Sequence, residues 1–258
     1  MIALKLRLNV DRTIEVARKF LDPDYTLIYQ MGKVGSSSLH KSLPKSIQIH
    51  SLYGKSPCTI RHRLFPAQYF KRILVDVLKR FLIRRRKTIN IITVVRDLND
   101  RDVSMFFQDL PLWLLDTVKS KNTKEPWDAD MNFLLDSYKN SFDHMYGMHW
   151  FDTEFRKFSN IDIFKYPFSK SEGFALISEG KFRILILLAD KIDSSAAIVE
   201  KFVGEKITLL RSNESGDKWY ASVYREFKSR LSSLEEIKAL KKQSKIMKHF
   251  FGTDIPPK

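Results

Sequence analysis

The sequence has a single cysteine and no long apolar run, and these absences exclude several classes of protein. Cys58 is the only cysteine among 258 residues, which excludes both an intramolecular disulfide framework and a multi-cysteine zinc site. No run reaches the ~20 apolar residues that a membrane-spanning helix needs. Residues 1–20 lack the apolar core and the small-residue cleavage site of a signal peptide. These absences predict a cytoplasmic protein without a transmembrane segment.

Acidic residues are also scarce, since 30 Asp and Glu face 45 Lys and Arg and leave a net charge of +15. Residues 71–87 carry eight basic residues and one acid, and 225–248 carry eight and three. This surplus indicates an anionic partner. The run "KRFLIRRRK" (79–87) fits a solvated helix end, a peripheral membrane or partner surface, or a channel for an acidic glycan. Phe81 is its only aromatic residue, so we expect no nucleic acid there.

Hydrophobic residues at 43% and aromatic residues at 12% are typical of a globular protein. Short β-branched runs alternate with helical patterns, which favours an α/β fold with a mostly parallel sheet. The predicted strands are 25–30, 46–51, 89–95 and 182–189, with weaker candidates at 162–166 and 206–210. The predicted helices are 11–21, 37–43, 68–84, 100–118, 130–146, 151–158, 193–203, 217–230 and 233–250. We expect a single domain over 1–258, with a helical insertion or lid at about 100–158 and a C-terminal helix at about 233–250.

The stretch "TLIYQMGKVGSSSLHKSL" (26–43) combines a strand, a turn with glycines and a helix start. Gly32 and Gly35 let the backbone approach a ligand closely, and Lys33 adds a positive charge. The serines at 36–38 offer hydroxyls and the unpaired N–H groups of a helix start. The stretch has neither the spacing of a Walker A loop nor the GxGxxG of a dinucleotide fold. It predicts an anion site of another kind, with an ordinary strand–turn–helix connection as the alternative.

The stretch "INIITVVRDLNDRDVSMFFQDL" places Arg96 directly after an apolar strand and Ser104 eight residues later. Asn99 or Asp100 is predicted to cap the helix that carries the serine. An arginine at the carboxyl end of a strand and a serine on the next helix can converge on one anion. The alternative is that Arg96 pairs with Asp97 or Asp100.

Together the two stretches resemble the paired signatures of the sulfotransferases that use 3′-phosphoadenosine 5′-phosphosulfate (PAPS). The first signature, a K-x-G-[ST]-[ST]-like loop between a strand and a helix, is matched by Lys33, Val34, Gly35, Ser36, Ser37 and Ser38. Arg96 and Ser104 match the second signature in order and spacing. The resemblance implies a P-loop-type three-layer sandwich with a central, mostly parallel sheet and a helical insertion. It also implies that the loop binds the 5′-phosphosulfate, that Arg96 and Ser104 bind the 3′-phosphate, and that no metal is needed.

Other segments resemble bacterial sulfotransferase-like proteins of capsular polysaccharide synthesis, which carry an N-K-W-Y-S signature. The segments are "YQMGKVGSSSL", "HWFDTEF", "RILILLADKID" and "GDKWYASVYREFK", and the resemblance runs from about residue 25 to 230. This chain departs from the signature with Asp217 and Ala221 at its two ends. The resemblance places Lys218 and Trp219 near the nucleotide. It also implies a carbohydrate or glycoconjugate as the acceptor.

His50 is the predicted general base. The run "SIQIHSL" places it at the carboxyl end of the second strand, beside the loop in a parallel sheet, and many sulfotransferases have a catalytic histidine at a comparable position. Lys33 is the second predicted catalytic residue, which would stabilise the bridging oxygen of the donor. The alternative for His50 is a histidine that binds the backbone or faces solvent.

Three further interpretations remain open from the residues. A segment with aromatic and acidic residues forms a candidate acceptor pocket, with core packing as the alternative. Its candidate residues are Trp150, Asp152 and Glu154, and His144 and His149 flank them. The chain could instead be a P-loop kinase of a small molecule that uses Mg-ATP. It could also be a non-catalytic protein that binds anions or nucleic acid through its basic runs.

Overall fold

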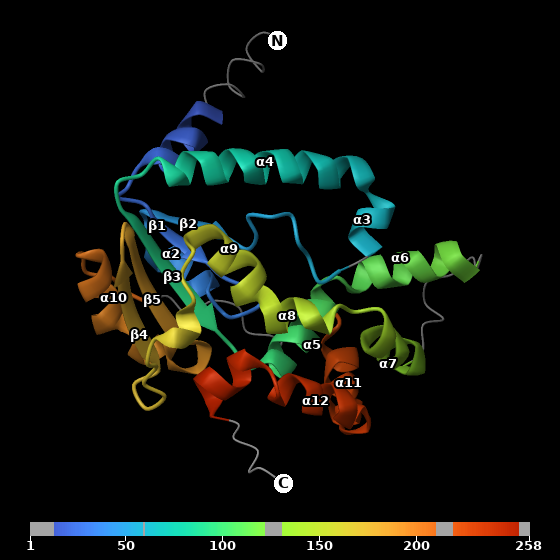
Figure 1. Ribbon diagram of the computed structural model, residues 1–258. Helices are drawn as coiled ribbons and strands as arrows, with labels where there is room; N and C mark the ends of the chain where they lie inside the picture. Colours follow the sequence, from blue (N-terminus) through green and yellow to red (C-terminus); the bar gives the residue numbers. More distant parts are fainter. Residues whose placement is uncertain (1–12, 59, 122–130, 210–218, 253–258) are drawn as a thin grey trace.

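The structure is a computed structural model that describes residues 13–58, 60–121, 131–209 and 219–252. Its centre is a five-stranded sheet in the order β2-β1-β3-β5-β4 (Figure 1). Neighbouring strands are parallel except at one edge, where β4 and β5 form an antiparallel pair. The strands are β1 (Thr26–Tyr29), β2 (Ser46–Ile49), β3 (Ile89–Val95), β4 (Phe174–Glu179) and β5 (Phe182–Leu188). The predicted α/β fold with a mostly parallel sheet is confirmed.

Helices form most of the remaining described chain, beginning with a helix over 13–21. The labelled α-helices are α2 (Ser37–Ser42), α3 (Ile60–Leu64), α4 (Pro66–Arg84), α5 (Leu98–Gln108), α6 (Leu110–Lys121), α7 (Met131–Asn140), α8 (His144–Trp150), α9 (Arg156–Ser159), α10 (Ala196–Val203), α11 (Ala221–Arg230) and α12 (Glu235–Lys242). Short 3₁₀ or π turns are η2 (Phe151–Phe155), η3 (Ile163–Lys165), η4 (Ala189–Ser194), η6 (Leu231–Leu234) and η7 (Met247–Phe251). Within the described ranges, no helix combines the length and apolarity needed to cross a membrane.

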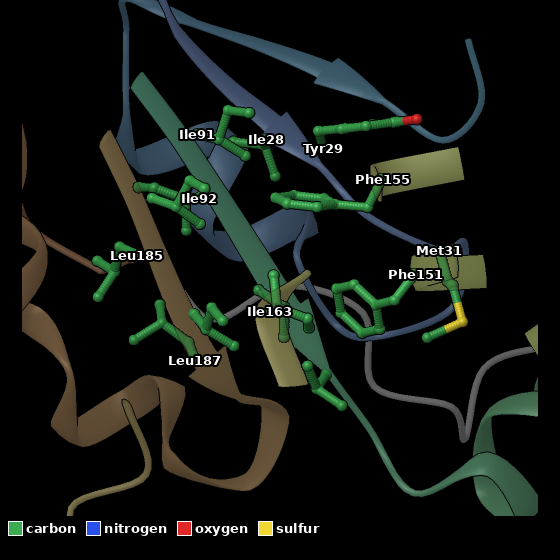
Figure 2. Packing of buried hydrophobic residues seen from close by; sticks show 14 of the residues in the cluster. Ile28, Tyr29, Met31, Ile91, Ile92, Phe151, Phe155, Ile163, Leu185 and Leu187 are labelled. Atoms are coloured by element: carbon green, nitrogen blue, oxygen red, sulfur yellow. The ribbon is translucent and has the colours of Figure 1, made fainter. Parts of the chain in front are cut away.

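Both faces of the sheet are covered by side chains from helices. Phe158 of α9 packs against Phe182 with ring centroids 5.9 Å apart. Phe202 of α10 lies 5.3 Å from the guanidinium of Arg183, the next residue of β5. Because consecutive strand residues point to opposite faces, these helices lie on opposite sides of the sheet. Figure 2 shows more of this core, including Tyr29, Phe155 and Ile163. Burial on both faces explains why the β3 and β5 sequences are continuously apolar.

A second hydrophobic cluster lies among α5, α6, α7 and α11. Its centre is Phe106, whose ring stacks on Trp113 at 5.3 Å and on Phe227 at 5.8 Å. Cys58, the single cysteine, is fully buried in the same cluster. Residues that lie before β3 and after β5 in the sequence therefore share one core.

Some predicted strands differ from those observed. The segment 162–166 is not a strand but contains the turn η3, because the Asp162 carboxylate accepts from the Phe164 N–H at 3.2 Å and starts a helical turn. Residues 206–209 form no strand, and residue 210 lies outside the described residues. Strand β4 was not predicted, although it lies between the positive-φ glycines Gly173 and Gly180.

The long predicted helices are interrupted. The helix predicted at 100–118 ends at Asp109, whose buried carboxylate binds Arg61 at 2.6 Å, and α6 then begins at Leu110. The helix predicted at 130–146 is α7 and α8, with Asp143 capping the second through the Tyr146 N–H. The C-terminal helix predicted at 233–250 is divided in the same way into α12 and η7. Each break changes the direction in which the helical chain runs.

The carboxyl ends of β1, β2 and β3 lie side by side along one edge of the sheet, the edge at which these strands end, because the three strands are parallel neighbours. Three connections leave from this edge, after Tyr29, after Ile49 and after Val95. In open α/β sheets, ligands bind outside this edge. The fold therefore brings together the stretches that carry the predicted site residues.

Candidate functional site

A pocket of about 510 Å³ opens at the carboxyl edge of β1, β2 and β3. Its walls come from the loop after β1, the segment after β2, and helices α4 and α5. Its lining residues are Gly32, Lys33, Gly35, Ser36, Ser37, Gln48, His50, Lys55, Ser56, Pro57, Arg61, Arg72, Arg96, Arg101, Ser104, Met105, Gln108 and Tyr146. The pocket thus brings together the predicted loop, the predicted arginine and serine, and the predicted histidine.

Positive charge dominates this pocket, which we call the cationic pocket. Six of its side chains are cations: Lys33, Lys55, Arg61, Arg72, Arg96 and Arg101. Among the residues that the structure describes, no carboxylate lines it. Cations gathered in a concave site attract anions and bind them through charge-assisted hydrogen bonds. A ligand with several negative charges, spread over the length of the pocket, is the best match.

The loop after β1 is held in place by two arginines of the neighbouring segment. Lys33 adopts φ 69° and Gly35 adopts φ 86°, so the loop uses the left-handed region twice. The Lys33 carbonyl accepts from Arg96 Nη1 at 3.2 Å, and the Gly32 carbonyl accepts from Arg101 Nε at 3.1 Å. These bonds stabilise a backbone conformation that a lysine adopts only at a cost. They also connect the two predicted motifs directly.

Ser36 is held in the loop by two glutamine side chains. Its buried hydroxyl oxygen accepts from the side-chain amides of Gln30 and, at 3.1 Å, of Gln48. The Gln30 amide is oriented by the Val94 N–H, which donates to its oxygen at 3.2 Å. Since a hydroxyl accepts two hydrogen bonds and donates one, the Ser36 proton remains available to an anion in the cationic pocket.

Helix α5 begins two residues earlier than predicted, and Asp97 is its cap rather than Asn99 or Asp100. The Asp97 carboxylate accepts from the Asn99 and Asp100 N–H groups at 2.7 and 3.3 Å, because Asp97 has extended backbone dihedrals directly after β3. Asp100 instead pairs with Lys228 at 2.9 Å. Neither acid pairs with Arg96, which reaches the loop, while Ser104 lines the cationic pocket.

Arg101 is a site residue that the sequence interpretation missed. Its side chain is fully buried, and its Nη1 binds Asp102 at 2.6 Å. Among the described residues its buried Nη2 has no hydrogen-bond partner, and Arg101 is one of the residues that line the cationic pocket. An unpaired buried donor is costly, and an anionic ligand would satisfy it. The available signal was the three-residue spacing between Arg101 and Ser104, which places both on one face of a helix.

Asp102, the ion-pair partner of Arg101, belongs to a buried ionic cluster. Its carboxylate binds Lys241 at 2.8 Å and lies 3.5 Å from His144 Nδ1. Burial alone would raise the pKa of Asp102, but the charges of Lys241 and Arg101 and the neighbouring His144 ring outweigh it and hold the pKa at about 2. His144, which flanks the candidate residues of the acceptor pocket, therefore belongs to this structural cluster.

His50 lies at the mouth of the cationic pocket directly after β2. Its ring is accessible to solvent there, and its Nδ1 donates to the Gln30 carbonyl at 3.3 Å. This tautomer leaves the lone pair on Nε2 free to accept a proton. Although one side of the imidazole is accessible, the protein around the rest of it removes water, and this desolvation lowers the pKa of His50. The charges of Arg72 and Arg101 lower the pKa further. A neutral histidine at neutral pH is a competent base.

The segment after β2 is held by two residues predicted for the acceptor pocket. Trp150 Nε1 donates to the His50 carbonyl at 3.3 Å. The buried Glu154 carboxylate accepts from Tyr29 Oη, from Ser51 Oγ and from the Leu52 N–H, each at 2.9 Å. Both side chains are fully buried, so they do not line a pocket. They instead fix the backbone that carries His50.

A second pocket of about 450 Å³ adjoins the cationic pocket and shares Lys55, Ser56 and Tyr146 with it. Its other lining residues are Tyr69, Asp143, Met145, His149 and Thr153. It is less charged than the cationic pocket and combines aromatic with hydroxyl groups. We call it the adjoining pocket. None of the three residues predicted for the acceptor pocket lines it, although the flanking His149 does.

Several other residues singled out in the sequence lie away from both pockets. Val34 is buried, and the Ser38 hydroxyl donates to the Gly35 carbonyl at 3.2 Å. Trp219 is 66% exposed and contacts Tyr220 edge to face. Lys218 lies outside the described residues. Asp152 pairs with Lys245 at 3.2 Å on the surface.

Comparison with known families matches residues 122–252 to the NKWYS family, described as "Putative capsular polysaccharide synthesis protein". The matched segment is half of the chain. The chain belongs to the NKWYS family. No curated protein and no solved structure matches it.

NKWYS membership confirms the resemblance to proteins of capsular polysaccharide synthesis, over 122–252 rather than 25–230. The matched segment contains β4, β5 and helices α7 to α12. Of the described residues that line the cationic pocket, only Tyr146 falls within it. The family therefore indicates a role related to polysaccharides. The match does not cover the other described residues of the cationic pocket, which all precede residue 122.

Proposed function

We propose that this NKWYS protein is a sulfotransferase that moves a sulfuryl group from PAPS to a hydroxyl of a carbohydrate or glycoconjugate. The observation that carries the proposal is the hydrogen bond from Arg96 to the Lys33 carbonyl, which joins the two sulfotransferase-like motifs in one pocket. Support also comes from the six cations and from the unpaired Arg101 Nη2, since a doubly phosphorylated donor supplies anionic groups at both ends.

The described residues fit the separate charges of this donor. We assign Ser36, Ser37 and the backbone around Gly35 to its 5′-phosphosulfate. We assign Arg96 and Ser104 to its 3′-phosphate, with Arg101 between the two groups. The donor supplies the sulfuryl group: the acceptor oxygen forms a bond to sulfur, the sulfur–oxygen bond to phosphate breaks, and 3′-phosphoadenosine 5′-phosphate leaves.

The chain's own residues position the reactants and handle charge. His50 Nε2 accepts the proton of the attacking hydroxyl. Lys33 offsets the negative charge that develops on the bridging oxygen of the leaving phosphate. Because Trp150 and Glu154 fix the backbone at His50 and directly after it, the base is oriented before the acceptor arrives.

The adjoining pocket is the best location for the acceptor. It shares Lys55, Ser56 and Tyr146 with the cationic pocket that His50 lines, and aromatic faces with nearby hydroxyl groups suit a sugar. The polysaccharide role of the NKWYS family agrees with such an acceptor. A screen of saccharides for release of 3′-phosphoadenosine 5′-phosphate tests this assignment.

The runner-up is a kinase that uses Mg-ATP. In magnesium nucleotide sites the metal is usually held through one or two carboxylates as well as the phosphates. The described residues that line the cationic pocket are cations and neutral groups, and none of them is a carboxylate that could hold the metal. This charge pattern favours a donor with two separate anionic ends.

Binding of the nucleotide product is the first test. Saturating 3′-phosphoadenosine 5′-phosphate is expected to raise the melting temperature by about 5–10 °C, because a ligand at a hundred times its Kd adds about 2.7 kcal/mol of stability. Lys33→Ala and Arg96→Ala should each weaken binding about tenfold to a hundredfold, since each removes a charge-assisted contact. Differential scanning fluorimetry and isothermal calorimetry measure both effects.

Arg156→Ala is the matched control for the charge changes. Arg156 is half exposed, lies outside the cationic pocket and pairs with Asp162 at 3.5 Å. The variant should bind the nucleotide like the wild type. No shift at millimolar nucleotide would refute the proposal. A shift that needs ATP and Mg²⁺ together would indicate the kinase, and steeply salt-dependent heparin or DNA binding without a nucleotide response would indicate an anion-binding protein.

A further inference from the structure

Helix α4 presents an apolar stripe to solvent. The exposed fractions are 65% for Phe70, 70% for Leu74, 47% for Val77, 52% for Leu78 and 51% for Phe81. Spacings of three and four residues place these side chains on one face of the helix. Large exposed apolar patches on a folded protein mark interaction sites.

The opposite face of α4 fastens the helix to the rest of the protein. Asp76 and Ile83 are buried there. The Asp76 carboxylate accepts from the Gly54 N–H at 3.2 Å and pairs with Lys79 at 3.0 Å. The apolar stripe therefore points away from the body of the protein, and Figure 1 shows α4 along the top of the molecule, with the helix over 13–21 near one of its ends.

Exposed cations flank the apolar stripe. Lys71, Arg84 and Arg85 are exposed, and the Arg85 guanidinium lies 4.2 Å from the centre of the Phe81 ring. The only acid between Pro66 and Lys87 is Asp76, which is buried on the inner face. The outer face of α4 is thus apolar and positive, without a negative charge of its own.

We propose that this outer face docks on the surface of an anionic lipid bilayer. An amphipathic helix with large apolar side chains on one face and lysine or arginine beside them is the pattern that lies in the plane of a membrane interface. The 19 residues of α4 give a contact about 28 Å long. A second copy of the chain fits less well, because pairing two such faces would bring their cations together without opposite charge.

Vesicle flotation with the full chain tests the proposal. Binding is expected to vesicles of phosphatidylglycerol and phosphatidylcholine, not to phosphatidylcholine alone, and is expected to fall with added salt. Replacing Lys71, Arg84 and Arg85 with glutamine should weaken binding about a hundredfold, at about fivefold for each cation. The pair Leu74→Ser and Phe81→Ser should weaken it at least tenfold, because the inserted apolar side chains are lost.

Leu176→Ser is the matched control, since Leu176 is equally exposed at 51% on the edge strand β4. It should leave vesicle binding unchanged. Each variant should keep the wild-type melting temperature, so that lost binding is not lost folding. Equal binding to both vesicle types, or to neither, would overturn the proposal. So would a dimer, measured by light scattering, that dissociates in the Leu74→Ser, Phe81→Ser variant. Because no nucleotide is present, the result is independent of the sulfotransferase proposal.

Discussion

Replacing His50 with alanine is expected to lower sulfuryl transfer by about 10²–10⁴-fold, the usual contribution of a general base. Nucleotide affinity should stay near the wild-type value, because His50 is assigned to the acceptor hydroxyl and not to the phosphates. Turnover with an identified acceptor and calorimetry with the nucleotide product measure the two quantities. His40→Ala is the matched control: its Nδ1 contacts Ser46 Oγ at 2.8 Å, and it does not line the cationic pocket. Unchanged turnover in His50→Ala would reject the assignment.

The pH dependence of transfer gives a second readout of the same residue. Neutral His50 is the base, and its pKa lies below the usual 6.5 because of burial and of Arg72 and Arg101. Transfer should therefore persist as the pH falls to 6.5 and decline only below it. Arg72→Gln removes one of the charges that lower this pKa, so the decline should begin at a higher pH. A profile that does not move in Arg72→Gln would contradict this explanation.

Replacing Asp102 with alanine is expected to lower the free energy of unfolding by about 3–5 kcal/mol, which is typical when one partner of a buried ionic group is removed. Arg101 and Lys241 would then be buried without their shared carboxylate. Urea denaturation measures the loss. Asp102→Asn, which keeps the shape of the side chain, provides the measurement if the alanine variant does not fold.

Asp100→Ala is the matched control for Asp102, because both acids lie on α5. Asp100 forms an exposed pair with Lys228, and exposed pairs contribute about 0–1 kcal/mol. A similar small loss in both variants would show that the buried cluster contributes little.

The stability of the wild type should also depend on Asp102 as the pH changes. Its pKa is about 2 in the folded protein and about 3.9 in an unfolded chain. A lowered folded-state pKa adds stability that is complete above about pH 3.9 and is lost as the pH falls toward 2. Acid unfolding followed by circular dichroism should therefore show a component in this range that is absent in Asp102→Asn.

Much of the sheet could be predicted from the sequence, because burial on both faces leaves an unbroken apolar run. This holds for β3 and β5, and the glycine-rich turn marks the end of β1. Strand β4 was missed because it is an edge strand with exposed Leu176, which weakens the pattern. The segment 162–166 was wrongly predicted to be a strand. Asp162 caps a helical turn there through a local hydrogen bond, which the apolar periodicity does not reveal.

The residues of the site could be predicted only where a local sequence pattern, such as a strand followed by a turn or a helix, marks their positions. Lys33 and Arg96 follow strand ends and Ser104 lies on the helix after β3, and all three line the cationic pocket. Arg101 could not be separated from an ordinary surface arginine, because its burial depends on Asp102 and on Lys241, which is 140 residues away in the sequence. Trp150 and Glu154 looked like pocket residues because an aromatic and an acid also suit a sugar, whereas here they hold the segment after β2.

The single cysteine provides a means of following the protein on a surface. Cys58 is fully buried, and burial raises the pKa of its thiol to about 11, so the reactive thiolate is scarce at neutral pH. A maleimide dye should therefore leave the wild-type chain unlabelled while it is folded. A cysteine introduced at Leu78 would then be the one reactive position. The emission of a polarity-sensitive dye at that position would report the depth of α4 against a lipid surface, without any change to the rest of the protein.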